Sequence, residues 1–501
     1  MNRILLLLPV LAISLAGCTM APKYSRPEAP VPNAWPKGPA YKEVMGVAPA
    51  KAVAEIPWQE FFVDPRLRKL IALALTNNRD LRVAALNIER TRALYQIQRS
   101  DLLPKVDATA AATLQRLSED FSGTGLPMNI HQHTVGLGIS SYELDLFGRV
   151  RSLKDQALEH YLATGQARRS VQISLVAEVA ATYLRLAADR ERLQLAKETL
   201  TSQQSSYQLI RSRFEAGISS ALVLHQAQTS VDTARVDIAR YTTFTAQDEN
   251  ALNLVVGSPV PAELLPSALS GTLTALKDPA PGLPSEVLLS RPDILQAENL
   301  LKGANANIGA ARAAFFPRIT LVSSVGFGSD DLAGLFTSGS FVWKFAPQIS
   351  LPIFSGGSNR ANLKVAEVDR DIAIAHYEKA IQTAFREVAD AFAQRGTIDD
   401  ELSAQQSLTD ALAESYRLSQ ARYEKGVDSY LNVLDSQRSL YGAQQNLINA
   451  RLVRLLNLAT IYKVLGGGAV ASAEAGSAKN GTGHDRIILT NLQGNDTHAQ
   501  N

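Results

Sequence analysis

The sequence predicts a mixed α and β fold, in which long antiparallel helices adjoin short membrane-spanning strands and the whole arrangement occurs twice. Three observations support this class. One stretch of the chain recurs at a fixed offset. Two segments lack proline and nearly lack glycine over lengths that suit very long helices. Two segments in each half alternate apolar and polar residues, as half-buried strands do.

The duplication is clearest around two glycines. Arg213-Phe214-Glu215-Ala216-Gly217 recurs 209 residues later as Arg422-Tyr423-Glu424-Lys425-Gly426. The match then continues without a gap over the next forty residues, as far as Gly257 in the first copy and Gly466 in the second. A self-match of this length indicates two tandem copies of one structural unit. Each copy is predicted to be a helix that ends at glycine, a tight turn at Gly217 or Gly426, and a second helix running back. We assign the first repeat to 66–257, the second to 286–468 and a linker to 258–285.

The N-terminus is typical of an exported lipoprotein. Arg3 precedes a largely apolar run, Ile4 to Ala16, which is too short to span a bilayer and suits a signal peptide over 1–17. The sequence Leu15-Ala16-Gly17-Cys18 resembles the bacterial lipobox, which implies that Cys18 carries a covalent lipid and becomes the mature N-terminus. Thr19 follows, and the resemblance then implies the outer membrane. The alternative is an ordinary signal peptide with an incidental cysteine. Cys18 is the only cysteine, so no internal disulfide can form.

Two terminal segments are predicted to lack helices. Nine prolines fall between Pro22 and Pro65, so the acylated segment 18–65 is expected to be an extended strap along the outside of the protein. The tail 469–501 is rich in small and polar residues and is expected to be disordered. The net charge of +2 gives no reason to expect nucleic acid as a partner.

The helices are predicted to be long rods. Only Gly165 interrupts the chain between Gly148 and Gly217, and only Gly396 interrupts Ser358 to Lys425. A helix of this length measures about 100 Å. Seven-residue spacing of apolar positions, as in the set Val179, Leu186, Leu193 and Leu200, indicates coiled-coil packing. No apolar stretch of 18 or more residues follows Cys18, so no transmembrane helix is expected.

Four segments are predicted to be strands: 106–117 and 133–147 in the first half, and 318–327 and 341–354 in the second. The last alternates best, with Phe341, Trp343, Phe345, Ile349, Leu351 and Ile353 on one side. Strands of this length span a bilayer when tilted, and alternation of apolar and polar residues is typical of membrane barrels. The alternative is an ordinary hairpin on a soluble sheet.

The number of strands predicts an oligomer. Four strands cannot close a barrel, and an open edge in lipid leaves backbone groups without hydrogen bonds. Two chains would give eight strands and a filled barrel, whereas three would give twelve and a water-filled lumen. The sequence therefore favours a transmembrane β-barrel shared by a trimer, with four strands from each chain.

Longer motifs then carry a resemblance to a known family. Each half runs helix, strand, strand, long helix, turn, helix. The resemblance is carried by this order of elements and by three motifs: the run Arg422–Leu440, the closing segment Tyr462–Gly468 and the opening segment Cys18–Tyr24. In these features the chain resembles the TolC-like outer-membrane factors, in particular the acylated, OprM-like (NodT-type) branch that serves RND efflux pumps. The resemblance covers about Tyr24 to Gly468. It implies a homotrimer in the outer membrane of a Gram-negative bacterium, continued as a helical barrel across the periplasm. A periplasmic adaptor and an inner-membrane RND-type transporter are the implied partners.

The resemblance also implies a gate at the periplasmic end. Matching residue by residue places the constriction at Leu431, Asp435 and Arg438, which are spaced four and three and so share one helix face. Repeated by a threefold axis, they would give an apolar plug above an acidic ring. Arg438 or Arg422 could neutralise Asp435. The alternative is Leu431 as seam packing and Asp435–Arg438 as a surface ion pair.

Two further sets of residues follow from the same matching. Arg422 and Tyr423 are implied to hold the inner helix pair shut. The turns at Gly217 and Gly426 are implied to dock the adaptor.

No catalytic constellation is found, so the chain is not predicted to be an enzyme. His131-Gln132-His133 is expected in a loop between strands, with metal binding as the less favoured interpretation. No cofactor is expected besides the lipid on Cys18. The predicted function is a passive outer-membrane exit duct for drugs or other small molecules. The alternatives are a duct for type I protein secretion and a coiled-coil lipoprotein without a pore.

Overall fold

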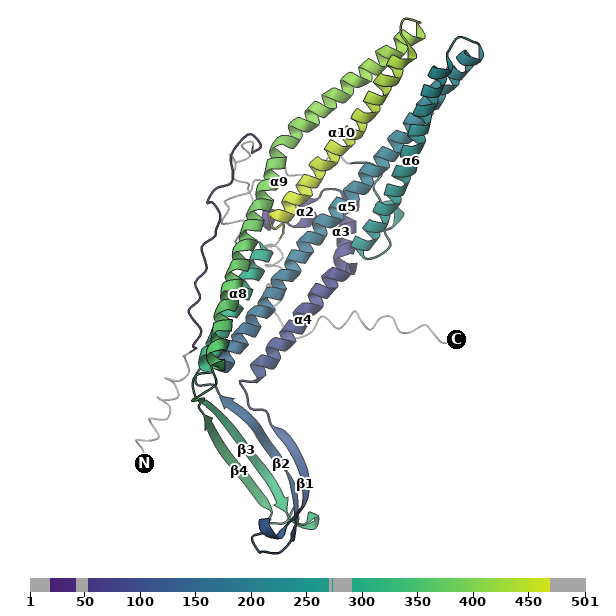
Figure 1. The fold of residues 1–501 in the computed structure, drawn as a ribbon. Helices are drawn as coiled ribbons and strands as arrows, with labels where there is room; N and C mark the ends of the chain where they lie inside the picture. Colours follow the sequence, from purple (N-terminus) through teal and green to yellow (C-terminus); the bar gives the residue numbers. More distant parts are fainter. Residues whose placement is uncertain (1–18, 42–52, 270–272, 274–290, 469–501) are drawn as a thin grey trace, which may run out of the picture. The chain divides into compact units, whose positions relative to one another are not determined.

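The computed structural model describes residues 19–41, 53–269, 273 and 291–468 (Figure 1). The predicted signal peptide, Cys18, the tail 469–501 and residues 286–290 lie outside the described residues. Contacts divide the chain into two units. Unit 1 comprises Met1–Ala29, Ala85–Ala167 and Leu295–Ala380, and unit 2 comprises Pro30–Ala84, Arg168–Ile294 and Ile381–Asn501. Each unit contains segments of both repeats, so the duplication does not produce two separate domains.

The long helices of the first repeat recur in the second repeat with equal or nearly equal lengths. The main helices are α3 (Pro65–Asn77), α4 (Arg79–Ser100), α5 (Arg149–Glu215), α6 (Ala221–Val256), α8 (Pro292–Ala313), α9 (Ser358–Glu424) and α10 (Tyr430–Val464). Helices α5 and α9 are each 67 residues long, which corresponds to about 100 Å. Each forms an antiparallel hairpin with the helix that follows it, α6 or α10 (Figure 1).

One helix is apolar enough, by length and composition, to cross a membrane. It is α5, and 67% of its most apolar 18-residue window is buried inside the protein. Packing within the protein therefore accounts for this apolar character.

The strands form one antiparallel sheet in unit 1. They are β1 (Asp107–Leu117), β2 (Met128–Leu144), β3 (Arg318–Ser329) and β4 (Phe341–Ser350), in the spatial order β1-β2-β3-β4. The two repeats meet between β2 and β3, where Gly136 is paired with Gly326. A Cβ atom on Gly326 would lie 2.2 Å from the backbone oxygen of Val135, so this close approach requires glycine. Strands β1 and β4 are left as the edges of the sheet.

The predicted bounds of two strands, the second and the fourth, are wrong. The second strand runs over Met128–Leu144 and not 133–147, because its pairing with β1 extends to Leu117↔Met128. It therefore includes His131 and His133, which were expected in a loop. At its other end, Asp145 leaves the sheet to cap the helix that follows. The fourth strand ends at Ser350 and not at residue 354, because Ser350 pairs with Arg318, the first residue of its partner β3.

The strap is extended over most of its described length, but not all of it. A 3₁₀ turn, η2 (Val53–Glu55), and a four-residue helix, α2 (Trp58–Phe61), lie within it. The expectation that this segment cannot be helical is wrong here, because Pro57 occupies the N-cap position, where a missing N–H costs nothing.

Burial of Phe61 and Phe62 anchors this part of the chain in the core of unit 2. Both rings contact Tyr462, with centroid distances of 4.7 and 5.5 Å. A buried arginine lies in the same unit. Arg291 donates to Asp293 (2.6 Å), to Glu387 (2.8 Å) and to a backbone oxygen of α10 (2.9 Å). The mostly buried guanidinium is therefore fully paired.

Candidate functional site

The two hairpin turns in unit 2 have the same backbone geometry. Gly217 and Gly426 adopt φ values of +74° and +73°. In the first turn the N–H of Ile218 donates to the oxygen of Arg213 at 2.8 Å, and in the second Val427 donates to Arg422 at 2.9 Å. This is the Schellman pattern, in which glycine takes the left-handed position. Both predicted turn glycines thus end a 67-residue helix and begin a tight reversal.

The predicted constriction residues share one exposed face of α10. Leu431 is 53% exposed, and Asp435 and Arg438 are exposed beside it. The opposite face of the helix, with Val433 and Leu434, is buried. Leu431 is therefore not seam packing within the chain, and all three side chains are free to face another molecule or a lumen.

The predicted ion pairs of Asp435 are wrong. Within the described chain, neither Arg438 nor Arg422 forms an ion pair with it. Arg422 instead pairs with Asp428, on the other side of the turn at Gly426. The hydrogen bond from Arg422 holds the pKa of Asp428 below its ordinary value. The reason is local: the turn brings residue 428 back beside the last turn of α9, whereas Asp435 lies nearly two helical turns further along α10.

Tyr423 connects the two hairpins to each other. Its hydroxyl accepts a hydrogen bond from Nη1 of Arg213 at 2.7 Å, and the same guanidinium lies 4.9 Å from the centre of its ring. The first-repeat counterpart of Arg422 thus reaches across to the second hairpin. Sequence reasoning identified Tyr423 but missed Arg213 and Asp428, although the position of Arg213 in the first copy of the motif was a usable signal.

A small apolar cluster supports this contact between the hairpins. Its buried members are Ile210, Ala227, Tyr430, Val433 and Leu434. Burial raises the pKa of Tyr430 to about 12, so its phenol stays neutral in the cluster. The cluster is small, so it adds only limited stability to the contact between the hairpins.

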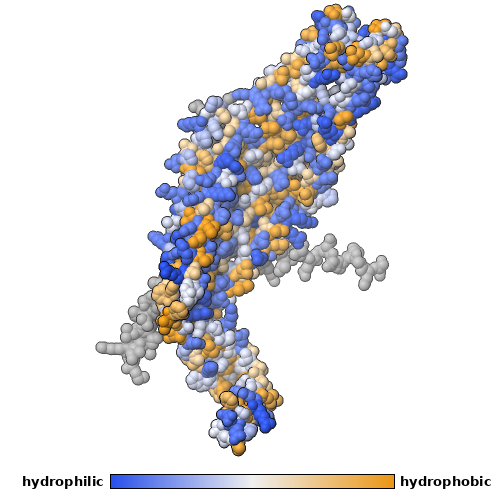
Figure 2. Space-filling model, in the orientation of Figure 1, coloured by the Kyte–Doolittle hydropathy of each residue, from blue (hydrophilic) through white to orange (hydrophobic). Residues whose placement is uncertain are grey.

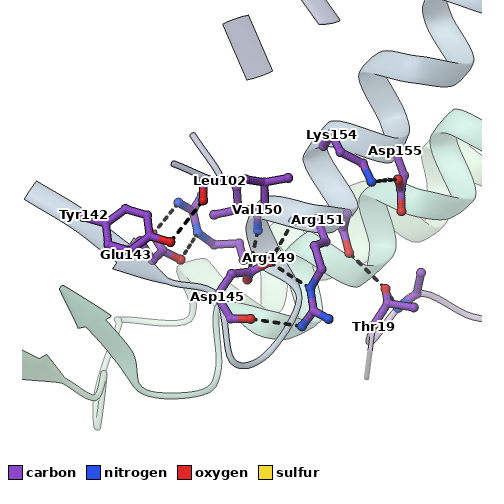
Figure 3. A network of polar contacts seen from close by, with 12 residues as sticks. Thr19, Leu102, Tyr142, Glu143, Asp145, Arg149, Val150, Arg151, Lys154 and Asp155 are labelled. Atoms are coloured by element: carbon purple, nitrogen blue, oxygen red, sulfur yellow. Dashed lines mark hydrogen bonds and ion pairs between the residues drawn. The ribbon is translucent and has the colours of Figure 1, made fainter. Parts of the chain in front are cut away.

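A second polar network in unit 1 fixes the strands to the helices (Figure 3). Glu143 at the end of β2 accepts from Arg149 of α5 at 2.6 and 2.9 Å and from Arg318 of β3 at 2.7 Å. Asp145 accepts from the backbone N–H groups of Val150 and Arg151 at 3.1 and 2.8 Å, which caps α5. Sequence reasoning missed this network, because its members are not spaced as any helix or strand pattern.

The strap is held to unit 1 by a buried carboxylate. Glu298 of α8 accepts from Nη2 of Arg26 at 2.8 Å, from Nζ of Lys302 at 3.1 Å and from the hydroxyl of Tyr24 at 3.2 Å. Near the start of the strap, Gly309 allows close approach, since a Cβ there would lie 2.6 Å from the backbone nitrogen of Ala21. Cys18, the predicted lipid attachment site, lies outside the described residues.

No group of three or more potential metal ligands occurs in the described parts of the chain. His131 and His133 lie two positions apart on β2 and therefore point to the same face of the sheet. They supply two ligands at most.

Comparisons with known proteins agree with this architecture. Residues 70–258 and 283–467 match the family model described as outer membrane efflux protein. The chain is 51% identical over 462 residues to the solvent efflux pump outer membrane protein SrpC of Pseudomonas putida, covering 92% of this chain and 98% of that protein. It is 44% identical to the outer membrane protein OprJ of Pseudomonas aeruginosa, covering 92% and 95% of the two chains.

A solved structure gives the same result for the fold. The open state of the MtrE outer membrane channel of Neisseria gonorrhoeae is similar with a TM-score of 0.81 and 41% identity, covering 90% of this chain and 99% of that one. The predicted fold class and the predicted family resemblance are confirmed by these matches. The chain belongs to the family of outer membrane efflux proteins.

Proposed function

We propose that this protein is a passive outer-membrane exit channel of a tripartite efflux system, built from three copies of the chain. One observation carries the proposal: a four-stranded antiparallel sheet with one apolar face and two edge strands that have no partner within the described chain. The chain itself would carry out no chemistry.

The sheet has the two faces that a membrane barrel needs. Phe341, Trp343, Phe345 and Ile349 alternate along β4 and are all largely exposed, Trp343 to 72%. Lys344 and Gln348 alternate with them and lie on the other face. Aromatic rings exposed on a sheet of a folded protein would be costly in water but are favourable against lipid.

Closure of this sheet requires further copies. An unpaired edge in hydrocarbon leaves backbone N–H and C=O groups without partners. Placing β4 of one copy beside β1 of the next removes both edges, and three copies give twelve strands around a water-filled lumen.

The helices offer a second surface for the same contact. Leu86, Leu94 and Ile97 of α4 are exposed, as are Val365 and Ile372 of α9. Figure 2 shows hydrophobic side chains exposed among hydrophilic ones over the helical part of this face. Neighbouring copies would bury these residues.

Membership of the family supports a proposal for the partners and the cargo. An efflux system of this kind needs an inner-membrane pump for energy, so we assign an RND-type transporter and a periplasmic adaptor as partners. The turns at Gly217 and Gly426 are the proposed docking points, and a lipid on Cys18 is the proposed second membrane anchor. The relative SrpC is named as part of a solvent efflux pump, which favours small molecules as cargo.

The contact between Arg213 and Tyr423 is proposed to hold the gate closed, with Leu431 and Asp435 lining the constriction. Opening would displace the second hairpin and break the hydrogen bond of 2.7 Å. Single-channel conductance in planar bilayers tests this. We expect Arg213→Met, which breaks the contact with Tyr423, and separately Asp435→Ala in the constriction, to raise the conductance of the channel.

Arg211→Met is the matched control. Arg211 lies two residues away on the same helix, and its one ion pair with a described residue runs along that helix, to Glu215 at 2.9 Å. This variant should conduct like the wild type. Unchanged conductance in Arg213→Met would refute the gate, and absence of conductance in every form would favour a coiled-coil lipoprotein without a pore.

A further inference from the structure

Four polar side chains lie on the apolar face of the sheet, at the end away from the helices. The register pairs Arg116 with Asn129, Leu114 with His131 and Ala112 with His133. Because side chains alternate along each strand, Arg116, Asn129, His131 and His133 all point to one face. Strand β1 starts next to α4 and ends at Leu117, so Arg116 lies at the far end of the sheet.

The same register identifies this face as the apolar one. His133 is paired with Ser329, and the next row of this face joins Val135 to Phe327 and Phe327 to Phe341. The rings of Phe327 and Phe341 make an edge-to-face contact with centroids 6.2 Å apart. His133 therefore lies one row beyond an aromatic row, and His131 two rows beyond.

The depth of these rows in the membrane follows from the length of the apolar face. From Ile349 to Phe341 the apolar face of β4 covers eight residue steps, about 27 Å along the strand. At a tilt of about 40° this corresponds to roughly 20 Å across the membrane, close to the full apolar band of about 25 Å. The aromatic row of Phe327 and Phe341 then marks the outer interface. The row of His133 and those beyond it fall at the level of the lipid headgroups.

The charge of Arg116 has no counterion within the part of the chain that the structure describes, and its side chain is exposed. The loops at this end of the sheet carry four acidic residues, Glu119, Asp120, Asp330 and Asp331. Asp331 is engaged in its own loop, where it accepts from the backbone N–H of Ala333. An arginine beside lipid is stable only with an anionic partner or in water.

We propose that Arg116, Asn129, His131 and His133 bind phosphate groups of a phosphorylated glycolipid in the outer leaflet. This rests on the proposed function, which places the sheet in the outer membrane. The planar guanidinium matches two phosphate oxygens, and the amide and imidazole N–H groups are further donors. The apolar rows directly below would contact the acyl chains of the same lipid. A cation site is the weaker assignment, because two histidines alone do not complete a coordination shell.

Native mass spectrometry of the full-length trimer with added lipid A tests the proposal. The variant is Arg116→Gln combined with His131→Gln and His133→Gln, all exchanges of one polar side chain for another on an exposed face. We expect its apparent affinity for diphosphorylated lipid A to fall about tenfold or more, since charge-assisted contacts to phosphate are lost. Dephosphorylated lipid A should bind the wild type as weakly as the variant binds the phosphorylated form.

Lys344→Gln is the matched control, because it removes one positive charge from the opposite face of the same sheet. Its lipid binding should equal that of the wild type. Equal affinity of the triple variant and the wild type would overturn the proposal, as would a similar loss in Lys344→Gln. Displacement of the lipid by millimolar inorganic phosphate would indicate a site for free anions instead. The triple variant should keep wild-type conductance, so failure of this inference is separate from failure of the channel.

Discussion

Replacing Glu298 by glutamine removes the charge on which the strap depends. The side chain is only 4% exposed, and three donors converge on it. Although burial opposes ionisation, hydrogen bonds from Arg26 and Lys302 hold the pKa of Glu298 below its ordinary value. We expect Glu298→Gln to loosen the strap at Tyr24 to Arg26 without unfolding α8, because the neutral amide keeps the volume of the side chain.

The magnitude follows from the geometry. Arg26 makes contacts of 2.8, 3.0 and 3.1 Å to the carboxylate, but its own side chain is 46% exposed. A charge-assisted hydrogen bond contributes up to about 3 kcal/mol, and exposure of one partner reduces this by half or more. We therefore expect a coupling of about 1.5 kcal/mol between Arg26→Met and Glu298→Gln in a double-mutant cycle.

Amide hydrogen exchange of the strap measures this coupling. A loss of about 1.4 kcal/mol corresponds to roughly tenfold faster exchange if opening is local. Glu28→Gln makes the same charge change at an exposed position of the strap and should leave the rates unaltered. Coupling below about 0.5 kcal/mol, or equal effects of Glu28→Gln and Glu298→Gln, would refute the reasoning.

The same carboxylate gives the strap a defined pH dependence. The pKa of Glu298 is lower in the folded state than in the unfolded state, so its contribution is fully present above the ordinary glutamate pKa. The contribution is lost as the pH falls through the folded value. The opening of the strap, measured as the observed exchange rate divided by the intrinsic rate at the same pH, should therefore increase in acid in the wild type and much less in Glu298→Gln.

Three further predictions concern the helical part. Burial, followed by the charge of Asp189, raises the pKa of Asp248 to about 6. The folded protein therefore binds this proton more tightly than the unfolded chain, and the charged carboxylate destabilises the fold above about pH 6. Asp248→Asn should add about 1 kcal/mol of stability at pH 7.5 and little at pH 4, measured by thermal unfolding. Arg291→Met leaves Asp293 and Glu387 without their buried partner. It should lower the free energy of unfolding by about 3 kcal/mol, and with it the melting temperature. Gly257→Ala combines a φ of +79° with a Cβ only 2.5 Å from a backbone oxygen and should cost more than Gly217→Ala, where φ is +74° but the space is open; equal melting temperatures would contradict this.

The repeat and its helices could be predicted from the sequence because local residues decide them. Glycine and proline set the helix ends, and the offset of 209 residues reproduces both the starts and the ends of α5 and α9. The turn glycines, Gly217 and Gly426, follow from the same rule, since only glycine adopts the left-handed position at low cost.

Strand ends were less predictable because pairing between strands is not local. The start of β2 at Met128 depends on its partner Leu117, which no pattern within β2 reveals. The placement of His131 in a loop failed for this reason. Asp145, which appears in sequence as part of an alternating run, is taken out of the sheet by its capping role.

The placement of the proposed gate residues was predictable in part. Spacing alone places Leu431, Asp435 and Arg438 on one helix face, and the structure agrees. The ion pairs were not predictable, because a long arginine side chain can reach several carboxylates and the turn decides which is nearest. Arg422 reaches Asp428, across the turn at Gly426.

The tips of the two hairpins differ at one equivalent position, and this difference changes the partners of the two arginines. Residue 219 is serine and its counterpart 428 is aspartate, so Arg422 closes its own loop while Arg213 is left to bond Tyr423. The two turns have the same backbone geometry, yet their equivalent arginines bind different partners. A ring of three chains would thus contain six hairpins of two kinds that alternate around its circumference. Three of them could swing outward while the other three keep the rim intact, which six equivalent hairpins could not do.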